Sequence, residues 1–104
     1  MIIGIDLGTT NSLAAIWRNG ASELVPNALG SVLTPSAVSV DAAGAIIVGE
    51  AARDRLVSNP DHSIAAFKRY MGSNREFKLG TRRYRSEELS ALVLRQLKGD
   101  AECS

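Results

Sequence analysis

The stretch Ile3-Gly4-Ile5-Asp6-Leu7-Gly8-Thr9-Thr10-Asn11-Ser12 decides the fold, because it joins a β-branched apolar run to a turn of small polar residues. The apolar run over residues 1–7 predicts a short buried strand. Residues 8–12 predict a turn, since they are too small and too polar for the interior of an element. A second apolar run over residues 13–17 predicts a returning strand. The turn therefore joins two strands and does not lead into a helix.

The composition of this turn favours an anion site. The backbone N–H groups and hydroxyls of Gly8, Thr9, Thr10 and Asn11 can point at one anion, as in phosphate-binding nests. Asp6, at the end of a buried strand, requires a cation or several donors. A carboxylate beside a phosphate suggests a hydrated magnesium ion between them. The alternative is a tight hairpin in which Asp6 is hydrogen-bonded locally. The two common glycine motifs for nucleotides, which lead into a helix, are absent.

The rest of the chain reads as strands followed by helices. Asn19-Gly20 predicts a tight hairpin turn into a strand over 22–25, which makes an antiparallel meander of the first three strands. Residues 36–40 and 45–48 predict a second hairpin, and Gly80 predicts a turn between two short extended segments within 73–85. Apolar residues at helical spacing predict helices over 49–58 and 86–98.

The start of the second helix also carries a capping signal. Ser86 is the expected N-cap, and Glu87 and Glu88 lie at the positive end of the helix dipole. With Ser86 as the cap, Leu89 occupies the place of the Glu or Gln of a capping box, so no reciprocal bond is expected.

The composition limits the function. The 104 residues, 45% hydrophobic with a net charge of +1, suit one small domain or a piece of one, and that charge is too balanced for nucleic acid as the main partner. No apolar run reaches the ~20 residues of a membrane span, and the N-terminus does not resemble a signal peptide. The single cysteine, Cys103, excludes an internal disulfide. We therefore expect a cytoplasmic protein.

Residues 3–12 resemble the first phosphate-binding segment of the seventy-kilodalton heat-shock chaperones, the DnaK-type family on the actin-like ATPase fold. The resemblance continues in register through Pro26-Asn27, Leu33-Thr34-Pro35-Ser36, Val48-Gly49-Glu50, Asn59-Pro60, Phe67-Lys68-Arg69, Met71-Gly72 and Glu87-Glu88-Leu89-Ser90. The short passage over 71–84, with Lys78-Leu79-Gly80 and residues 92–95, is more similar to the HscC-like branch.

The resemblance implies a function. Family members bind ATP with magnesium and couple its hydrolysis to gripping unfolded polypeptide, with J-domain proteins and exchange factors as cochaperones. It implies that Asp6 holds a magnesium-bound water and that Gly8, Thr9, Thr10 and Asn11 line the β- and γ-phosphates. Thr9 would lie nearest the reacting phosphoryl group, and Lys68 would contact the γ-phosphate and help orient the attacking water. Without the resemblance, Lys68 is an ordinary solvated basic residue.

The fold class that follows is α/β: the N-terminal part of an actin-like (ribonuclease H-like) ATPase domain, with a mixed sheet that opens on an antiparallel meander, plus helices. Residues 1–104 would be its first-lobe opening strands and part of its outer subdomain. The resemblance places the second phosphate loop, the adenosine pocket and the peptide-binding domain outside these residues. We therefore expect weak or undetectable ATP binding and no turnover from this chain alone. The alternative function is a truncated, non-catalytic interaction module that retains the fold.

The remaining side chains carry structural expectations. Residues 13–17 and the apolar stripe over 89–97 are expected to lack cover, which favours self-association. Trp17 is expected in the core or at a subdomain interface. His62 is expected in a loop, Cys103 at an exposed or small apolar position, and the run over 82–85 on a solvated strand face.

Overall fold

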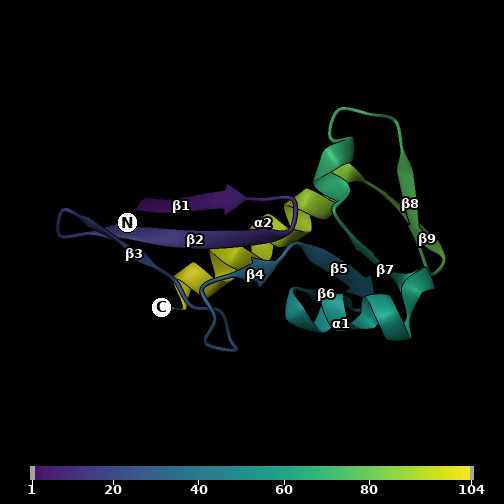
Figure 1. The fold of residues 1–104 in the computed structure, drawn as a ribbon, viewed down its shortest axis with the longest axis horizontal. Helices are drawn as coiled ribbons and strands as arrows, with labels where there is room; N and C mark the ends of the chain where they lie inside the picture. The colour runs from purple at the N-terminus through teal and green to yellow at the C-terminus, as the bar shows by residue number, and fades with distance from the viewer. Residues whose placement is uncertain (1, 104) are drawn as a thin grey trace.

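The computed structural model describes residues 2–103, and its first sheet carries the turn singled out above. Strands β1, β2 and β3 form a meander, and a short strand β4 pairs with the beginning of β2 (Figure 1). Asn19 and Gly20 both have positive φ, 51° and 78°, as the tight turn from β2 to β3 requires. The four strands are Ile2–Leu7, Asn11–Arg18, Ala21–Leu24 and Thr34–Pro35.

The second sheet follows directly from the first, since β5 begins two residues after β4 ends. Its order is β6-β5-β7, and helix α1 packs on β5 and β7. All strand pairs within residues 2–103 are antiparallel. The elements are β5 (Ala37–Val40), β6 (Ile46–Val48), α1 (Glu50–Ser58) and β7 (Ser63–Ala65).

The last two strands of the chain form a small hairpin. Strands β8 (Glu76–Leu79) and β9 (Arg82–Arg85) pair with each other, and two short 3-10 helices, η1 (Pro60–His62) and η2 (Phe67–Tyr70), flank β7. Figure 1 shows the hairpin on the α1 side of the molecule, away from β3. The predicted turn at Gly80 is confirmed.

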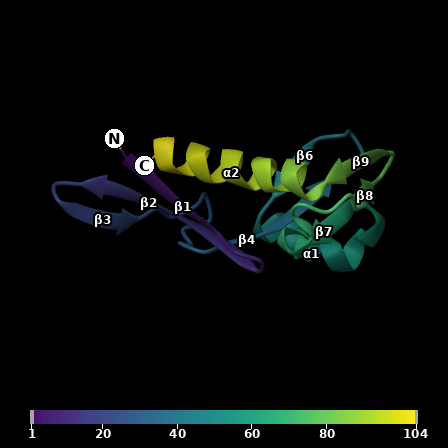
Figure 2. The same cartoon turned by 90° about the horizontal axis from the view of Figure 1, so that it is seen from above.

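Helix α2 (Ser86–Glu102) joins the two sheets into one core. It contacts β1 and β2 of the first sheet, β5 and β6 of the second, and η2. Figure 2 shows it running along the length of the molecule, over both sheets. Leu89, Val93, Leu97 and Ala101 are almost fully buried against Ile16, Val38 and Phe67. No helix within residues 2–103 has the length and apolar character of a membrane span.

This packing corrects the expectation that the stripe over 89–97 lacks cover. Leu89, Val93 and Leu97 are at most 2% exposed, because the inner face of the first sheet and η2 lie on them. Helix α2 also continues past residue 98, through Gly99. Leu97 and Ala101 bury on either side of that glycine, which offsets the roughly 1 kcal/mol cost of glycine in a helix.

The cap of α2 was also predicted wrongly. Strand β9 continues to Arg85, so Arg85 is the N-cap and Glu88 takes the third helical position. The Arg85 N–H donates to Glu88 Oε1 at 2.9 Å, which is the reciprocal bond that a Ser86 cap would have excluded. Ser86 begins the helix instead, and its hydroxyl donates to the Phe67 carbonyl at 2.5 Å.

The first strand is less buried than predicted. Its side chains alternate between exposed and half-buried, because α2 covers one face of the β1–β2 pair and nothing within residues 2–103 covers the other. The turn is also shorter than predicted, since Asn11 and Ser12 already belong to β2. Three residues, 8–10, make the connection.

Candidate functional site

The connection over residues 8–10, with Asn11, forms the candidate phosphate loop. It lies at the end of the β1–β2 ladder, just past the pair Leu7–Ser12. Gly8 is required there for steric reasons: a Cβ on residue 8 would lie 2.2 Å from the backbone oxygen of Asn11. The glycine thus allows the chain to double back closely, as the predicted turn requires.

Two backbone donors of this loop have no protein acceptor. Within residues 2–103, the N–H groups of Thr9 and Thr10 donate to no carbonyl or side chain. Thr9 is half-buried and Thr10 is exposed, so water or an anion can reach both. Unpaired N–H groups at a tight turn are the usual elements of a phosphate-binding concavity.

Asp6 lies on the open face of β1, opposite Leu13. It is exposed, and its carboxylate has no hydrogen bond or ion pair within residues 2–103. The expectation that Asp6 ends a buried strand, and therefore needs a compensating partner, was wrong because that face of β1 is uncovered. An exposed, unpaired carboxylate two residues before the loop can still bind the hydration shell of a cation.

Lys68 lies on η2, and its side chain extends to the end of β1, next to the loop. Its Nζ donates a hydrogen bond to the Leu7 carbonyl, across 61 positions of sequence. The side chain is exposed and forms no ion pair within residues 2–103. The structure therefore brings together the predicted lysine and the predicted loop, which is the one long-range feature of the site that the resemblance implied.

The surroundings of Lys68 hold it at this place. The neighbouring Phe67 is 1% exposed in the core, and its carbonyl accepts the Ser86 bond described above. At the other end of η2, Tyr70 packs edge-on against Phe77, with ring centroids 5.5 Å apart, and the Arg75 guanidinium lies 4.4 Å from the centre of the Tyr70 ring. The core and the β8–β9 hairpin thus fix the backbone of η2, from which the exposed Lys68 side chain extends to the Leu7 carbonyl.

Ser36 is a site residue that the sequence reasoning missed. It stands between β4 and β5, 3% exposed, and its N–H donates to the Thr10 carbonyl at 2.9 Å. Its hydroxyl donates to the Gly8 carbonyl at 2.8 Å. The one available signal was Ser36 itself, which ends a segment of the family resemblance without an assigned role.

The described residues form no complete metal centre. Within residues 2–103 no group of three or more His, Cys, Asp and Glu side chains could hold a metal ion. Magnesium is commonly bound through one or two carboxylates, water and substrate phosphates, so Asp6 suits one part of such a site.

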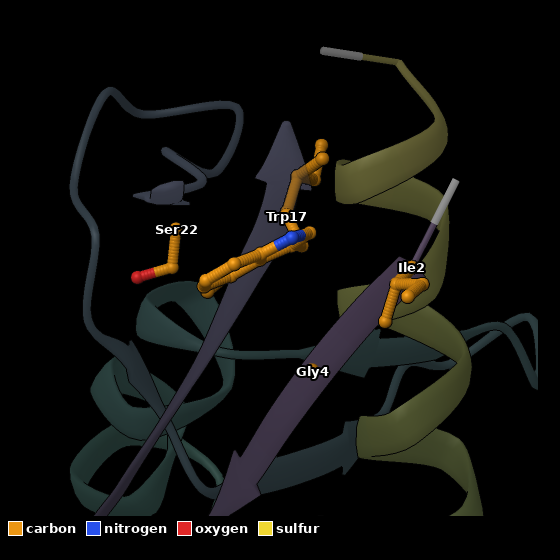
Figure 3. Close-up of a pocket in the computed structure, with 6 residues that line it drawn as sticks. Ile2, Gly4, Trp17 and Ser22 are labelled. Atoms are coloured by element: carbon orange, nitrogen blue, oxygen red, sulfur yellow. The ribbon is translucent and has the colours of Figure 1, made fainter. Parts of the chain in front are cut away.

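A hollow with a mainly apolar lining lies at the opposite end of the first sheet. It has a volume of about 270 Å³ and lies over the pairs Ile2–Trp17 and Gly4–Ala15 (Figure 3). Figure 3 shows Ile2 and Gly4 on one strand and Trp17 on the neighbouring one, and a Cβ on Gly4 would meet nothing within 4 Å. Trp17 is 52% exposed, so it does not belong to the core of residues 2–103. This hollow is separate from the phosphate loop.

Comparison with known families identifies the chain. The family described as "Hsp70 protein" has a model that matches residues 2–81. The chain belongs to the Hsp70 family. The match includes the phosphate loop, Ser36 and Lys68, and it ends at the turn between β8 and β9. The antiparallel sheets and helices of this Hsp70 chain agree with the N-terminal part of an actin-like ATPase domain. Hsp70 proteins are nucleotide-binding chaperones, and the match over residues 2–81 relates this chain to their ATPase domain.

Proposed function

We propose that this Hsp70 chain forms one wall of an ATP site, and that the whole protein hydrolyses ATP to ADP and phosphate to control its grip on unfolded polypeptide. In this wall Gly8, Thr9, Thr10 and Asn11 contact the β- and γ-phosphates. Lys68 contacts the γ-phosphate. The observation that carries the proposal is the meeting of the Lys68 ammonium with the end of β1, beside a loop with two unpaired N–H groups.

The chemistry suits these residue types. Phosphoryl transfer depends mainly on positioning and on neutralising negative charge, and a lysine ammonium is a compact charge on a flexible stem. Lys68 is held by a neutral carbonyl and by no carboxylate within residues 2–103. It can therefore turn from Leu7 to a phosphate oxygen without leaving an anion unpaired. Thr9, half-buried and two residues after Leu7, offers both an amide and a hydroxyl.

Magnesium, when bound, neutralises phosphate charge and orients the phosphate oxygens. Asp6 would hold it through water, since this carboxylate is exposed and has no competing cation within residues 2–103. Residues 2–103 supply one carboxylate to that site, and the remaining contacts must come from elsewhere in an ATPase domain. For this reason we propose that the chain alone binds ATP weakly or undetectably and does not turn it over.

The partners follow from the family. We propose unfolded polypeptides as clients and J-domain proteins and exchange factors as cochaperones, in the cytoplasm. Within the family, the HscC-like branch remains the proposed subtype.

The test uses a protein that carries the complete ATPase domain around these residues. Lys68→Ala should lower kcat by at least ~100-fold, as the loss of one charge-stabilising donor does, while ATP affinity changes by less than ~10-fold. Arg69→Ala is the matched control, because Arg69 is the adjacent exposed cation of η2. Unchanged kcat in Lys68→Ala, or an equal loss in Arg69→Ala, would overturn the proposed role of Lys68.

A further inference from the structure

Ser36 makes two hydrogen bonds to the phosphate loop from a different part of the fold. Its N–H binds the Thr10 carbonyl and its hydroxyl binds the Gly8 carbonyl, at 2.9 and 2.8 Å. Loop and serine are 28 positions apart in sequence. We call these two bonds the Ser36 clasp.

Counting hydroxyl protons shows which group donates in each hydrogen bond that links Ser12, Ser36 and Gly8. The hydroxyls of Ser12 and Ser36 are 2.8 Å apart, and either could donate. Ser36 has one hydroxyl proton, which goes to the Gly8 carbonyl, because a carbonyl can only accept. Ser12 must therefore donate to Ser36. Both serines are at most 3% exposed, so water does not readily replace either bond.

The clasp determines where the loop's free amide points. In a trans peptide the C=O and the N–H of one unit point in opposite directions. The Gly8 carbonyl points inward to buried Ser36, so the N–H of Thr9, which belongs to the same peptide unit, points away from it. This is one of the two N–H groups that have no acceptor within residues 2–103.

We propose that Ser36 is a positioning residue for phosphoryl transfer: the Ser36 clasp holds the Gly8 and Thr10 carbonyls inward, which fixes the Thr9 amide directly and holds the Thr10 amide between two anchored peptide units. This inference rests on the proposed function of the loop. Ser36 itself is buried behind the loop and touches no phosphate. It links the loop to the junction of β4 and β5, where the two sheets meet.

The first test needs no nucleotide. Backbone ¹⁵N relaxation on the 104-residue chain should give Thr9 and Thr10 order parameters near the rigid value of ~0.85 in the wild type and below ~0.6 in Ser36→Ala. Ser39→Ala is the matched control. Ser39 is a buried serine of β5 that bonds Arg55, Ser63 and the His62 carbonyl, and does not reach the loop. Unchanged loop order parameters in Ser36→Ala, or equal loosening in Ser39→Ala, would overturn the clasp.

The second test measures the catalytic consequence in a protein with the complete ATPase domain. Ser36→Ala should lower kcat about tenfold, as expected for one lost buried hydrogen bond, with ATP affinity nearly unchanged. Ser36→Thr, which keeps the hydroxyl, should restore most of kcat. Loss of kcat in Ser36→Ala that matches the loss in Ser39→Ala would indicate a merely structural role and overturn the proposal.

The two tests separate the two claims. If Ser36→Ala lowers the order parameters of Thr9 and Thr10 while the wild-type protein shows no ATP hydrolysis, the structural role of the Ser36 clasp is confirmed and the proposed function fails. If the wild type hydrolyses ATP and depends on Lys68, but Ser36→Ala changes neither kcat nor loop order, the proposed function holds and the role of Ser36 fails.

Discussion

The two ends of the β1–β2 hairpin differ in how they are held. At the Leu7–Ser12 end, residues from two other segments, Ser36 and Lys68, hydrogen-bond to the backbone around the turn. At the Ile2–Trp17 end, the outward side chains are apolar and surround an open hollow. The same two strands thus present a polar, ordered end suited to an anion, and an apolar end suited to a protein surface. Both ends belong to one strand pair. The polar end differs because Ser36 and Lys68, from other segments, bond to its backbone, whereas the apolar end is formed mainly by side chains of the two strands themselves.

The largest expected effect is on stability, and it concerns Phe67, the buried residue that holds η2 and Lys68 at the polar end. Phe67→Ala should lower the free energy of unfolding by about 3–5 kcal/mol, because Phe67 is 1% exposed and its loss leaves a cavity beneath η2. Trp17→Ala at the other end should cost about 1 kcal/mol, since half of that side chain is already in water. Urea denaturation measures both. Equal costs would contradict the contrast between the ends.

Glycines at the two ends provide a second, matched pair. Gly8→Ala should cost about 3 kcal/mol of unfolding free energy, because the added Cβ would collide with the Asn11 backbone oxygen. Gly4→Ala adds a Cβ that meets nothing within 4 Å, so its cost should be near zero. Thermal unfolding of both variants checks this. A tolerated Gly8→Ala would show that the turn is not as tight as described.

The smallest expected effect concerns the apolar end. We expect the chain to self-associate through the face around Trp17, and Trp17→Glu should raise the dimer dissociation constant about tenfold, or about 1.4 kcal/mol. Val57→Glu is the control, because Val57 is an exposed large apolar residue of α1 and does not line the hollow around Trp17. Sedimentation equilibrium measures the constants. A wild type that stays monomeric at high concentration would refute the expectation.

Local signals explain what could be predicted from the sequence. The turn at Asn19-Gly20 was predicted correctly because these two residues themselves adopt the positive φ angles that it requires. The helix over 49–58 was predicted to within one residue, since the spacing of its apolar residues is a local signal and Pro60, which follows it, disfavours a continuing helix. The cap of α2 failed because it depends on where β9 ends.

Contacts between distant segments explain the rest. Cover for Leu89, Val93 and Leu97 comes from the first sheet and from η2, which are separate segments of the chain, so the periodicity predicted an apolar stripe but not what packs on it. The position of Lys68 beside the loop came from the family resemblance and not from its neighbours in sequence. Ser36 was missed because a serine's role depends on which carbonyls the fold brings to it, here those of Gly8 and Thr10.

An amide-resolved titration of the ¹⁵N-labelled 104-residue chain with magnesium and ATP tests the central claim most directly. The claim is that the polar end of the β1–β2 hairpin is the phosphate-binding wall. We predict shift changes at Thr9, Thr10 and Asn11, none around Trp17, and no saturation at millimolar ATP, because this wall is only part of a site. Changes centred on the Trp17 end would contradict the claim. Saturation at micromolar ATP, on the order of −8 kcal/mol, would contradict the expectation that this wall is only part of a site.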